Sequence, residues 1–350
     1  MAVLLAYDAV RAATVADIVA AVAVEALKGT IKAFDPRLQA MKKHPEQASV
    51  AKNVCRILDG SEIVERYRDY RVQDTYSLRG IPQIHGGAKR AIKNAWQIIE
   101  DELHSVGDNP VIFPEGDDGV ALMGANFDST FVGLQADFLA SAMTVLAKVS
   151  ERRTDRMVNS AFSELPAFLA PNPGLNNGYM IPQYTAAALY MEMKAASISA
   201  SVDSVPTSAN QEDPVSNAYL AVTKAYRMVG KLRYVLAIES MCATQAHDLL
   251  GTRADRRPRS HCAASCVRWY RPCRTTVSSA TTSKRSRDRC STAPSSGPSR
   301  RWSARSSSDD TTRVPTRRRS GGPHGWATRT SFQPSPVTRR VSSGRAWRAC

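Results

Sequence analysis

The chain has 350 residues, a formal net charge of +15 and a pI near 9.7. This length allows one large domain or two or three smaller ones. A charge of this size is typical of nucleic-acid-binding proteins, but it is unevenly distributed. Residues 251–350 hold 23 Lys and Arg against 4 Asp, whereas residues 1–250 hold 24 against 28 Asp and Glu. The first 250 residues are therefore mildly acidic, and nucleic acid is not expected as their partner.

The last hundred residues, 251–350, form an Arg/Ser-rich, low-complexity tail without Leu, Ile, Met, Glu or Asn. With so few aliphatic side chains, the tail cannot bury enough apolar surface to offset the conformational entropy lost on ordering. It is therefore predicted to be disordered. It is either a genuine basic arm or the product of a shifted reading frame, and the abrupt change near Gly251 favours the second. The spacing of His261, Cys262, Cys266 and Cys273 fits no standard pairing of zinc ligands, and no metal is predicted.

The first 250 residues contain two cysteines, Cys55 and Cys242. This small number indicates a reducing compartment and no disulfide framework. The apolar N-terminal stretch is interrupted by charges at Asp8, Arg11 and Asp17, which argues against a membrane span and a signal peptide. A cytoplasmic protein is expected.

Helical periodicity dominates the first 250 residues and predicts an all-α fold, a long helical bundle. Helices are expected over residues 1–28, 49–58, 86–105, 128–158, 183–200 and 213–250. The third of these helices should turn one apolar face to the core of the bundle, with Ala88, Ile92, Ala95 and Ile99 on it. Asp213-Pro214 is a suitable N-cap and first-turn pair for the last one. Strand signals are nearly absent, with one short hairpin expected around residues 116–119.

The longest helical pattern, residues 128–158, is typical of a core helix in a bundle. Its apolar residues recur at three- or four-residue steps, at Phe131, Leu134, Phe138, Ala142, Val145 and Val149. A repeat of this kind keeps apolar side chains on one face over many turns.

A polar cluster lies between the apolar-periodic segments, at Gln73, Tyr76 and Arg79. Their spacing of i, i+3 and i+6 would stack them on one side of a helical turn. A planar guanidinium beside neutral donors suits a carboxylate ligand held by two parallel hydrogen bonds. The alternative is a helix-terminal cluster in which Asp74 pairs with Arg79.

Five ordered segments give the chain a resemblance to the aromatic amino acid ammonia-lyases, the family of histidine and phenylalanine ammonia-lyases. The segments are residues 72–79, 108–110, 124–127, 172–176 and 202–213. The sequences of two of these segments, Tyr76-Ser77-Leu78-Arg79 and residues 210–213, are most like those of the histidine branch. Asp128 departs from that branch, in which His is typical at this position. The resemblance implies the fumarase/aspartase-like helical fold over residues 1–250, as a partial lyase domain.

The resemblance also implies a reaction and a cofactor. Family members eliminate ammonia from an aromatic amino acid by using a methylidene-imidazolone electrophile formed from their own Ala-Ser-Gly. They are homotetramers whose active sites are shared between subunits. No Ala-Ser-Gly occurs in this sequence, and the family's loop with the tyrosine base has no counterpart in it. The chain is therefore expected to be truncated, to lack the cofactor and to be inactive alone.

Site roles follow from the matching segments. Arg79 would hold the substrate carboxylate, Gln73 and Tyr76 would position cofactor and substrate, and Phe127 would pack on the substrate ring. Glu212 would contact the polar end of the substrate, so that Tyr76 and Glu212 are the candidate catalytic residues. Without the resemblance, Phe127 would be interpreted as core, and Glu212 as a carboxylate favoured by a helix N-terminus.

Three of the histidines in the first 250 residues, His85, His104 and His247, show no paired spacing. Solvated or core-edge positions are expected for them rather than catalysis. The favoured function is elimination of ammonia from L-histidine to give urocanate. A phenylalanine or tyrosine lyase or aminomutase is the alternative within enzymes. A non-catalytic, basic nucleic-acid-binding protein built on a lyase-like body is the alternative from another class.

Overall fold

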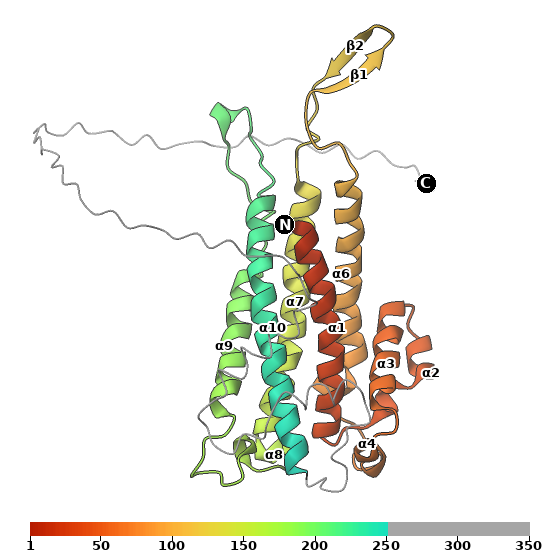
Figure 1. Ribbon diagram of the computed structural model, residues 1–350, viewed down its shortest axis with the longest axis vertical. Coiled ribbons are helices and arrows are strands. Elements are labelled where there is room, and N and C mark those ends of the chain that lie inside the picture. The colour runs from red at the N-terminus through yellow and green to blue at the C-terminus, as the bar shows by residue number, and fades with distance from the viewer. Residues whose placement is uncertain (251–350) are drawn as a thin grey trace, which may run out of the picture. The chain divides into compact units, whose positions relative to one another are not determined.

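The computed structural model describes residues 1–250, which form a bundle of long helices (Figure 1). The long helices are α1 (Ala2–Ala26), α6 (Ile81–Leu103), α7 (Thr130–Val158), α9 (Met180–Ala196) and α10 (Ala218–Leu249). Helix α7 packs against each of the other four. The predicted all-α bundle is confirmed, and the disorder predicted for 251–350 concerns residues outside the described part.

Short elements connect and flank the bundle. Elements η1 (Ile31–Phe34), α2 (Pro36–Ala40), α3 (Pro45–Leu58) and α4 (Glu62–Arg66) follow α1, and α5 (Tyr76–Arg79) precedes α6. Elements α8 (Ser160–Ser163), η2 (Ala167–Leu169) and η3 (Ser208–Asn210) lie in later connections. Strands β1 (Val111–Glu115) and β2 (Asp118–Leu122) pair antiparallel around a turn with Gly116 at φ 64°, which confirms the expected hairpin.

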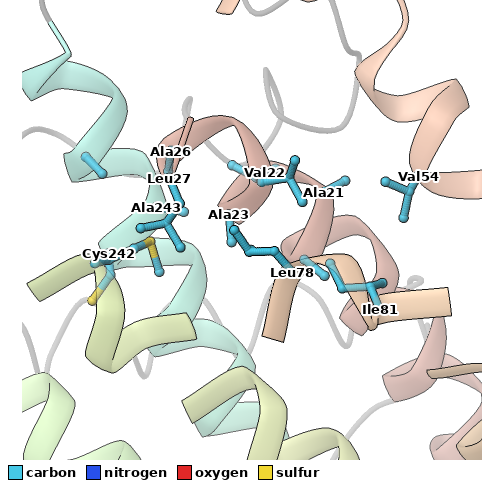
Figure 2. Packing of buried hydrophobic residues seen from close by; sticks show 14 of the residues in the cluster. Ala21, Val22, Ala23, Ala26, Leu27, Val54, Leu78, Ile81, Cys242 and Ala243 are labelled. Atoms are coloured by element: carbon cyan, nitrogen blue, oxygen red, sulfur yellow. The ribbon is translucent and has the colours of Figure 1, made fainter. Parts of the chain in front are cut away.

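Small side chains bring the helices together where α1, α5, α6 and α10 meet. Figure 2 shows Ala23 of α1 beside Leu78, and Leu27, which follows α1, near Cys242 and Ala243 in the same buried cluster. Close approach also fixes Gly86, because a Cβ atom there would lie 2.7 Å from the Cα atom of Gln47 in α3. The core positions predicted on α6 are buried as expected.

Helix α10 begins at Ala218, five residues later than predicted from Asp213-Pro214. The preceding residues make other hydrogen bonds. The Thr207 amide donates to the Glu212 carbonyl at 2.9 Å, and the Val215 amide donates to Ser204 Oγ at 2.8 Å. Because these bonds hold the chain in a loop, the predicted N-cap role of Asp213 was wrong.

The aromatic residues at the start of α7 are not in the core of the chain. Phe131 is 65% exposed, and Leu134 and Phe138 are exposed as well. The buried face of this part of α7 instead carries smaller side chains, among them Ala136 and Ala140. Periodicity identified the helix correctly, but it could not distinguish a face covered by the same chain from one left uncovered.

His85 is completely buried, contrary to the solvated or core-edge position expected for it. Its Nδ1 atom lies 3.0 Å from Oδ1 of Asp17, a buried carboxylate of α1 that also pairs with Lys89. Burial is the main cause of a lowered pKa for His85, so the imidazole is neutral and donates from Nδ1 to Asp17. The buried imidazole thus has a hydrogen-bond partner 68 residues away in the sequence.

Two further observations concern the expected compartment. Cys55 and Cys242 are free thiols. Of the described helices, α7 is long and apolar enough to cross a membrane by length and composition, but 56% of its apolar window is buried inside the bundle. A buried helix of this kind is what the core of a bundle requires.

Candidate functional site

Helix α5 is a single turn that carries Tyr76 and Arg79 at the lower end of the bundle in Figure 1, next to the start of α6. Gln73 precedes this turn, so only Tyr76 and Arg79 lie on one helical turn as predicted, and Gln73 does not. The three side chains nevertheless meet. Arg79 Nη1 donates to Gln73 Oε1 at 2.6 Å, and the Arg79 guanidinium carbon lies 4.7 Å from the centre of the Tyr76 ring.

The alternative pairing of Asp74 with Arg79 is wrong. Asp74 is buried, and its Oδ2 atom accepts a hydrogen bond of 2.7 Å from the Thr30 amide. Its nearest cation is Arg71, 4.0 Å from Oδ1. Burial raises the pKa of the Asp74 carboxyl, although the Thr30 amide counteracts this effect. Asp74 is therefore a structural residue that ties the segment before α5 to the end of α1.

Arg79 remains available to a ligand. No carboxylate of residues 1–250 lies within 4 Å of its guanidinium, which is half-buried. Tyr76 is 75% exposed beside it. An Arg that is oriented by an amide and a ring, but lacks an anionic partner, can donate hydrogen bonds from its remaining N–H groups to an external carboxylate.

Phe127 and Glu212 lie at the opposite end of the bundle from α5. Phe127 follows the hairpin and is 53% exposed. Helix α6 begins directly after α5 and ends shortly before the hairpin, and its 23 residues span about 34 Å. A single copy of residues 1–250 therefore brings Gln73, Tyr76 and Arg79 together, but it does not bring Phe127 or Glu212 to them.

The loop that carries Glu212 lies at the hairpin end of the bundle (Figure 1). Its base packs on α7, since a Cβ atom on Gly133 would lie 3.3 Å from atoms of both Ser201 and Ala218. Glu212 itself is exposed, and its Oε2 atom accepts a hydrogen bond of 2.6 Å from Thr207 Oγ1. Phe127 and Glu212 thus belong to the same end, on two neighbouring loops.

Asp137 of α7 fixes the base of that loop and was missed in the sequence. Its Oδ2 atom accepts hydrogen bonds from the amides of Ala200 and Ser201 at 2.8 and 2.9 Å, and Oδ1 pairs with Lys224 at 2.7 Å. Burial alone would raise the pKa of Asp137, but Lys224 and Ser201 lower it. The signal was present, because Asp137 is an acidic residue within the apolar pattern of a core helix.

No group of three or more His, Cys, Asp or Glu within residues 1–250 is arranged to hold a metal ion. The polar groups around α5 are an amide, a phenol and a guanidinium, which suit a carboxylate ligand. They do not include the Ala-Ser-Gly tripeptide from which the family's electrophile forms, and this tripeptide occurs nowhere in the sequence. The amide, phenol and guanidinium at α5 can therefore hold a carboxylate.

Comparison with protein families identifies the chain. The model of the family described as "Aromatic amino acid lyase" matches residues 1–271. The chain belongs to this family.

Curated relatives of the chain include histidine ammonia-lyases. The chain is 48% identical over 240 residues to the histidine ammonia-lyase of Caldanaerobacter subterraneus subsp. tengcongensis, a match covering 69% of this chain and 47% of the relative. It is 46% identical over 248 residues to histidine ammonia-lyase 2 of Fusobacterium nucleatum, covering 71% and 48%. The chain spans about half the length of the curated relatives it matches.

Solved structures of the family share the fold. Histidine ammonia-lyase from Trypanosoma cruzi superposes with a TM-score of 0.73 at 33% identity, over 83% of this chain and 55% of that one. Tyrosine aminomutase from Streptomyces globisporus superposes with a TM-score of 0.75 at 29% identity, over 82% and 58%.

Proposed function

We propose that residues 1–250 form the substrate-holding part of an ammonia-lyase site whose substrate is L-histidine and whose product is urocanate. The observation that carries this proposal is the arrangement at α5. Arg79 is oriented by Gln73 and Tyr76 and has no carboxylate partner in residues 1–250. The similarity to histidine ammonia-lyases supports histidine as the substrate.

In this proposal Arg79 binds the substrate carboxylate through the N–H groups that Gln73 does not occupy. Gln73 and Tyr76 hold the guanidinium in place and line the same surface. Phe127 packs on the substrate ring, and Glu212 contacts its polar end. The family's methylidene-imidazolone would activate the amine for departure. The sequence of this chain contains no Ala-Ser-Gly from which that group could form.

The 350 residues alone should therefore have no lyase activity. The β-proton of an amino acid is weakly acidic, and ammonia is a poor leaving group without activation. Holding the substrate in position contributes at most about 7–11 kcal/mol to lowering a barrier. Enzymes generally lower barriers by about 8–23 kcal/mol, and the electrophile and the base would have to supply the difference.

The site proposed here forms between copies of the chain. Arg79 and Glu212 lie at opposite ends of one bundle, so one substrate can contact both only if they come from different copies. Apolar side chains are exposed on three long helices, among them Phe138 of α7, Tyr184 of α9 and Leu220 of α10. In this proposal these exposed apolar side chains contribute to the association surface between copies. We propose a homotetramer in the cytoplasm.

The experiment uses a chimaera in which residues 1–250 replace the matched segment of the Caldanaerobacter subterraneus histidine ammonia-lyase. This chimaera should release urocanate from histidine. The variant Arg79→Ala should lower kcat/KM about a hundredfold, since it removes a charge-assisted hydrogen-bond pair of about 3 kcal/mol. The matched variant Arg68→Ala removes an exposed arginine that pairs only locally with Glu65, and it should leave activity unchanged.

Two results would contradict the proposal. A folded chimaera that acts on phenylalanine or tyrosine but not on histidine would favour the phenylalanine or tyrosine lyase or aminomutase. Two observations favour testing this second function: the similarity to tyrosine aminomutase, and Asp128 at a position where the histidine branch typically has His. A folded chimaera inactive on all three substrates would leave the nucleic-acid-binding alternative, which depends on residues 251–350, outside the described part.

A further inference from the structure

The turn α5 cannot maintain its own conformation. It has four residues, and its N-cap residue Thr75 makes no side-chain capping bond. An isolated helical turn is unstable in water, because nucleation fixes several dihedral angles for one hydrogen bond. Pro82 in the next turn has no N–H to offer the carbonyl of Leu78. The orientation of Tyr76 and Arg79 must therefore be imposed by neighbouring elements.

One of these neighbours is a buried ion pair between two long helices. Arg153 of α7 and Glu239 of α10 are both fully buried. Arg153 donates to both carboxylate oxygens, from Nε to Oε1 and from Nη2 to Oε2, the latter at 3.0 Å. Ser150 Oγ adds a hydrogen bond of 2.5 Å to Oε2. The carboxylate thus uses the Nε–Nη2 edge of the guanidinium and leaves Nη1 free for another acceptor.

That acceptor belongs to α5. Arg153 Nη1 donates to the carbonyl oxygen of Ser77 at 3.4 Å. Ser77 is buried and lies between Tyr76 and the core residue Leu78. The inner side of α5 is therefore attached to the bundle at two adjacent points, one polar and one apolar. Its outer side presents Tyr76 and Arg79.

A buried ion pair is a poor device for stability alone. Desolvation of two charges costs about as much as their attraction returns, and apolar replacements of similar volume are often neutral or stabilising. The Arg153 guanidinium does something that an apolar side chain cannot do, because it links α7, α10 and the backbone of α5 at one point. Its planar fork suits this task, with two N–H directions for the carboxylate and a third for the carbonyl.

We infer that Arg153 is a positioning residue that fixes the α5 turn, and through it the Tyr76 and Arg79 side chains, by its hydrogen bond to the Ser77 carbonyl. The inference rests on the proposed function only in giving α5 a substrate to hold. The attachment of α5 can be tested on the full 350-residue chain without any activity.

The test compares amide hydrogen exchange and the NMR signal of the Arg79 guanidinium in three variants. The double variant Arg153→Met with Glu239→Met keeps the bundle apolar and removes the link. It should accelerate exchange at the amides of residues 78–80 at least tenfold, while the amides in the middle of α10 keep their protection. The Arg79 Nε–H resonance should lose the ring-current shift that its contact with the Tyr76 ring gives it.

The variant Arg153→Lys serves if the double variant does not fold. Lysine keeps the charge opposite Glu239 but has no fork to reach Ser77, so the same amides should lose protection selectively. The control is Arg152→Met, at the preceding residue of α7, whose guanidinium pairs with Glu151 and Asp155 of α7 itself. Whatever its effect on overall stability, this variant should leave α5 exchange and the Arg79 signal unchanged relative to the rest of the bundle.

Unchanged relative protection at residues 78–80 in the folded double variant, or in Arg153→Lys, would overturn the inference. The same selective loss in Arg152→Met would overturn it too, because the effect would then be a general consequence of weakening α7. An inactive chimaera together with selective loss at α5 would refute the proposed function and leave the positioning role intact.

Discussion

The two ends of the bundle are built differently. At the α5 end, Leu78 and Ile81 are buried, and Asp74 and Ser77 are attached by hydrogen bonds to distant parts of the chain. At the hairpin end, every residue of β2 is exposed, and so are the loops with Phe127 and Glu212. The first end is organised by this chain alone. The second presents its polar and apolar groups outward.

The proposed site between copies would make use of this difference. A donor that is already ordered, such as Arg79, binds a ligand more tightly, because the entropy of ordering it was lost during folding and not on binding. Exposed loops carrying Phe127 and Glu212 gain a defined environment only against another surface. The proposed site between copies assigns a role to each end: one copy supplies the fixed end and another supplies the exposed end.

The largest expected effect is on the buried ion pair. Arg153→Met alone leaves the Glu239 carboxylate buried without its partner and should lower the free energy of unfolding by about 3–5 kcal/mol. The double variant with Glu239→Met should recover most of this loss. Urea unfolding of both variants measures the difference. Equal destabilisation by the single and double variants would show that the pair contributes net stability.

A second prediction contrasts apolar residues at the two ends. Leu78→Ala should lower the free energy of unfolding by about 2–5 kcal/mol, because Leu78 is buried in the core cluster. Val120→Ala in the exposed strand β2 should change it by less than about 0.5 kcal/mol. Thermal or urea unfolding of the full chain tests both. A large loss with Val120→Ala would mean that the hairpin is covered in solution, and measurement at several protein concentrations would show whether a second copy covers it.

The smallest effect is a pH dependence at the α5 end. Lys28, and after it Tyr70 and Arg71, lower the pKa of the Glu164 carboxyl to about 2. A carboxyl whose pKa is depressed on folding stabilises the native state above its unfolded pKa near 4.5. This contribution is lost as pH falls from about 4.5 towards 2. Because Glu164 is partly exposed, it should amount to no more than about 1 kcal/mol.

The variant Glu164→Gln tests this dependence. The stability difference between the original chain and the variant should be largest near pH 6 and should shrink as pH falls below 4.5. A matched change at an exposed carboxylate of the hairpin, Asp117→Asn, should give a smaller difference, since no ion pair of residues 1–250 involves Asp117. A difference for Glu164→Gln that grows at low pH would contradict the assignment.

Much of the fold could be predicted because local patterns and packing agree. Helix α6 is an example, since Ala88, Ile92, Ala95 and Ile99 recur at helical spacing and are all buried. The start of α10 could not be predicted, because hydrogen bonds made by Thr207 and Ser204 compete with the cap signal at Asp213. The burial of His85 depended on Asp17, which no local pattern could connect to it.

The candidate site shows the same division. Gln73, Tyr76 and Arg79 are close in sequence, so their spacing sufficed to predict that they meet. Phe127 and Glu212 were associated with them by resemblance alone. The sequence predicted a helix over residues 86–105, but it did not show that α6 keeps the two groups at opposite ends of one bundle. The network at Arg153 escaped notice because α7 and α10 contribute its two charges from positions 86 residues apart.

Complementation between two inactive variants of the chimaera tests the central claim most directly. Arg79→Ala damages the α5 end and Glu212→Ala damages the other, so co-assembled copies should form some sites with both ends intact. Random assembly predicts recovery of about a quarter of the unmodified activity. Arg79→Ala mixed with Gln73→Ala, two changes at the same end, should recover none. Absence of recovery in the first mixture, although mixed oligomers form, would contradict a site shared between copies.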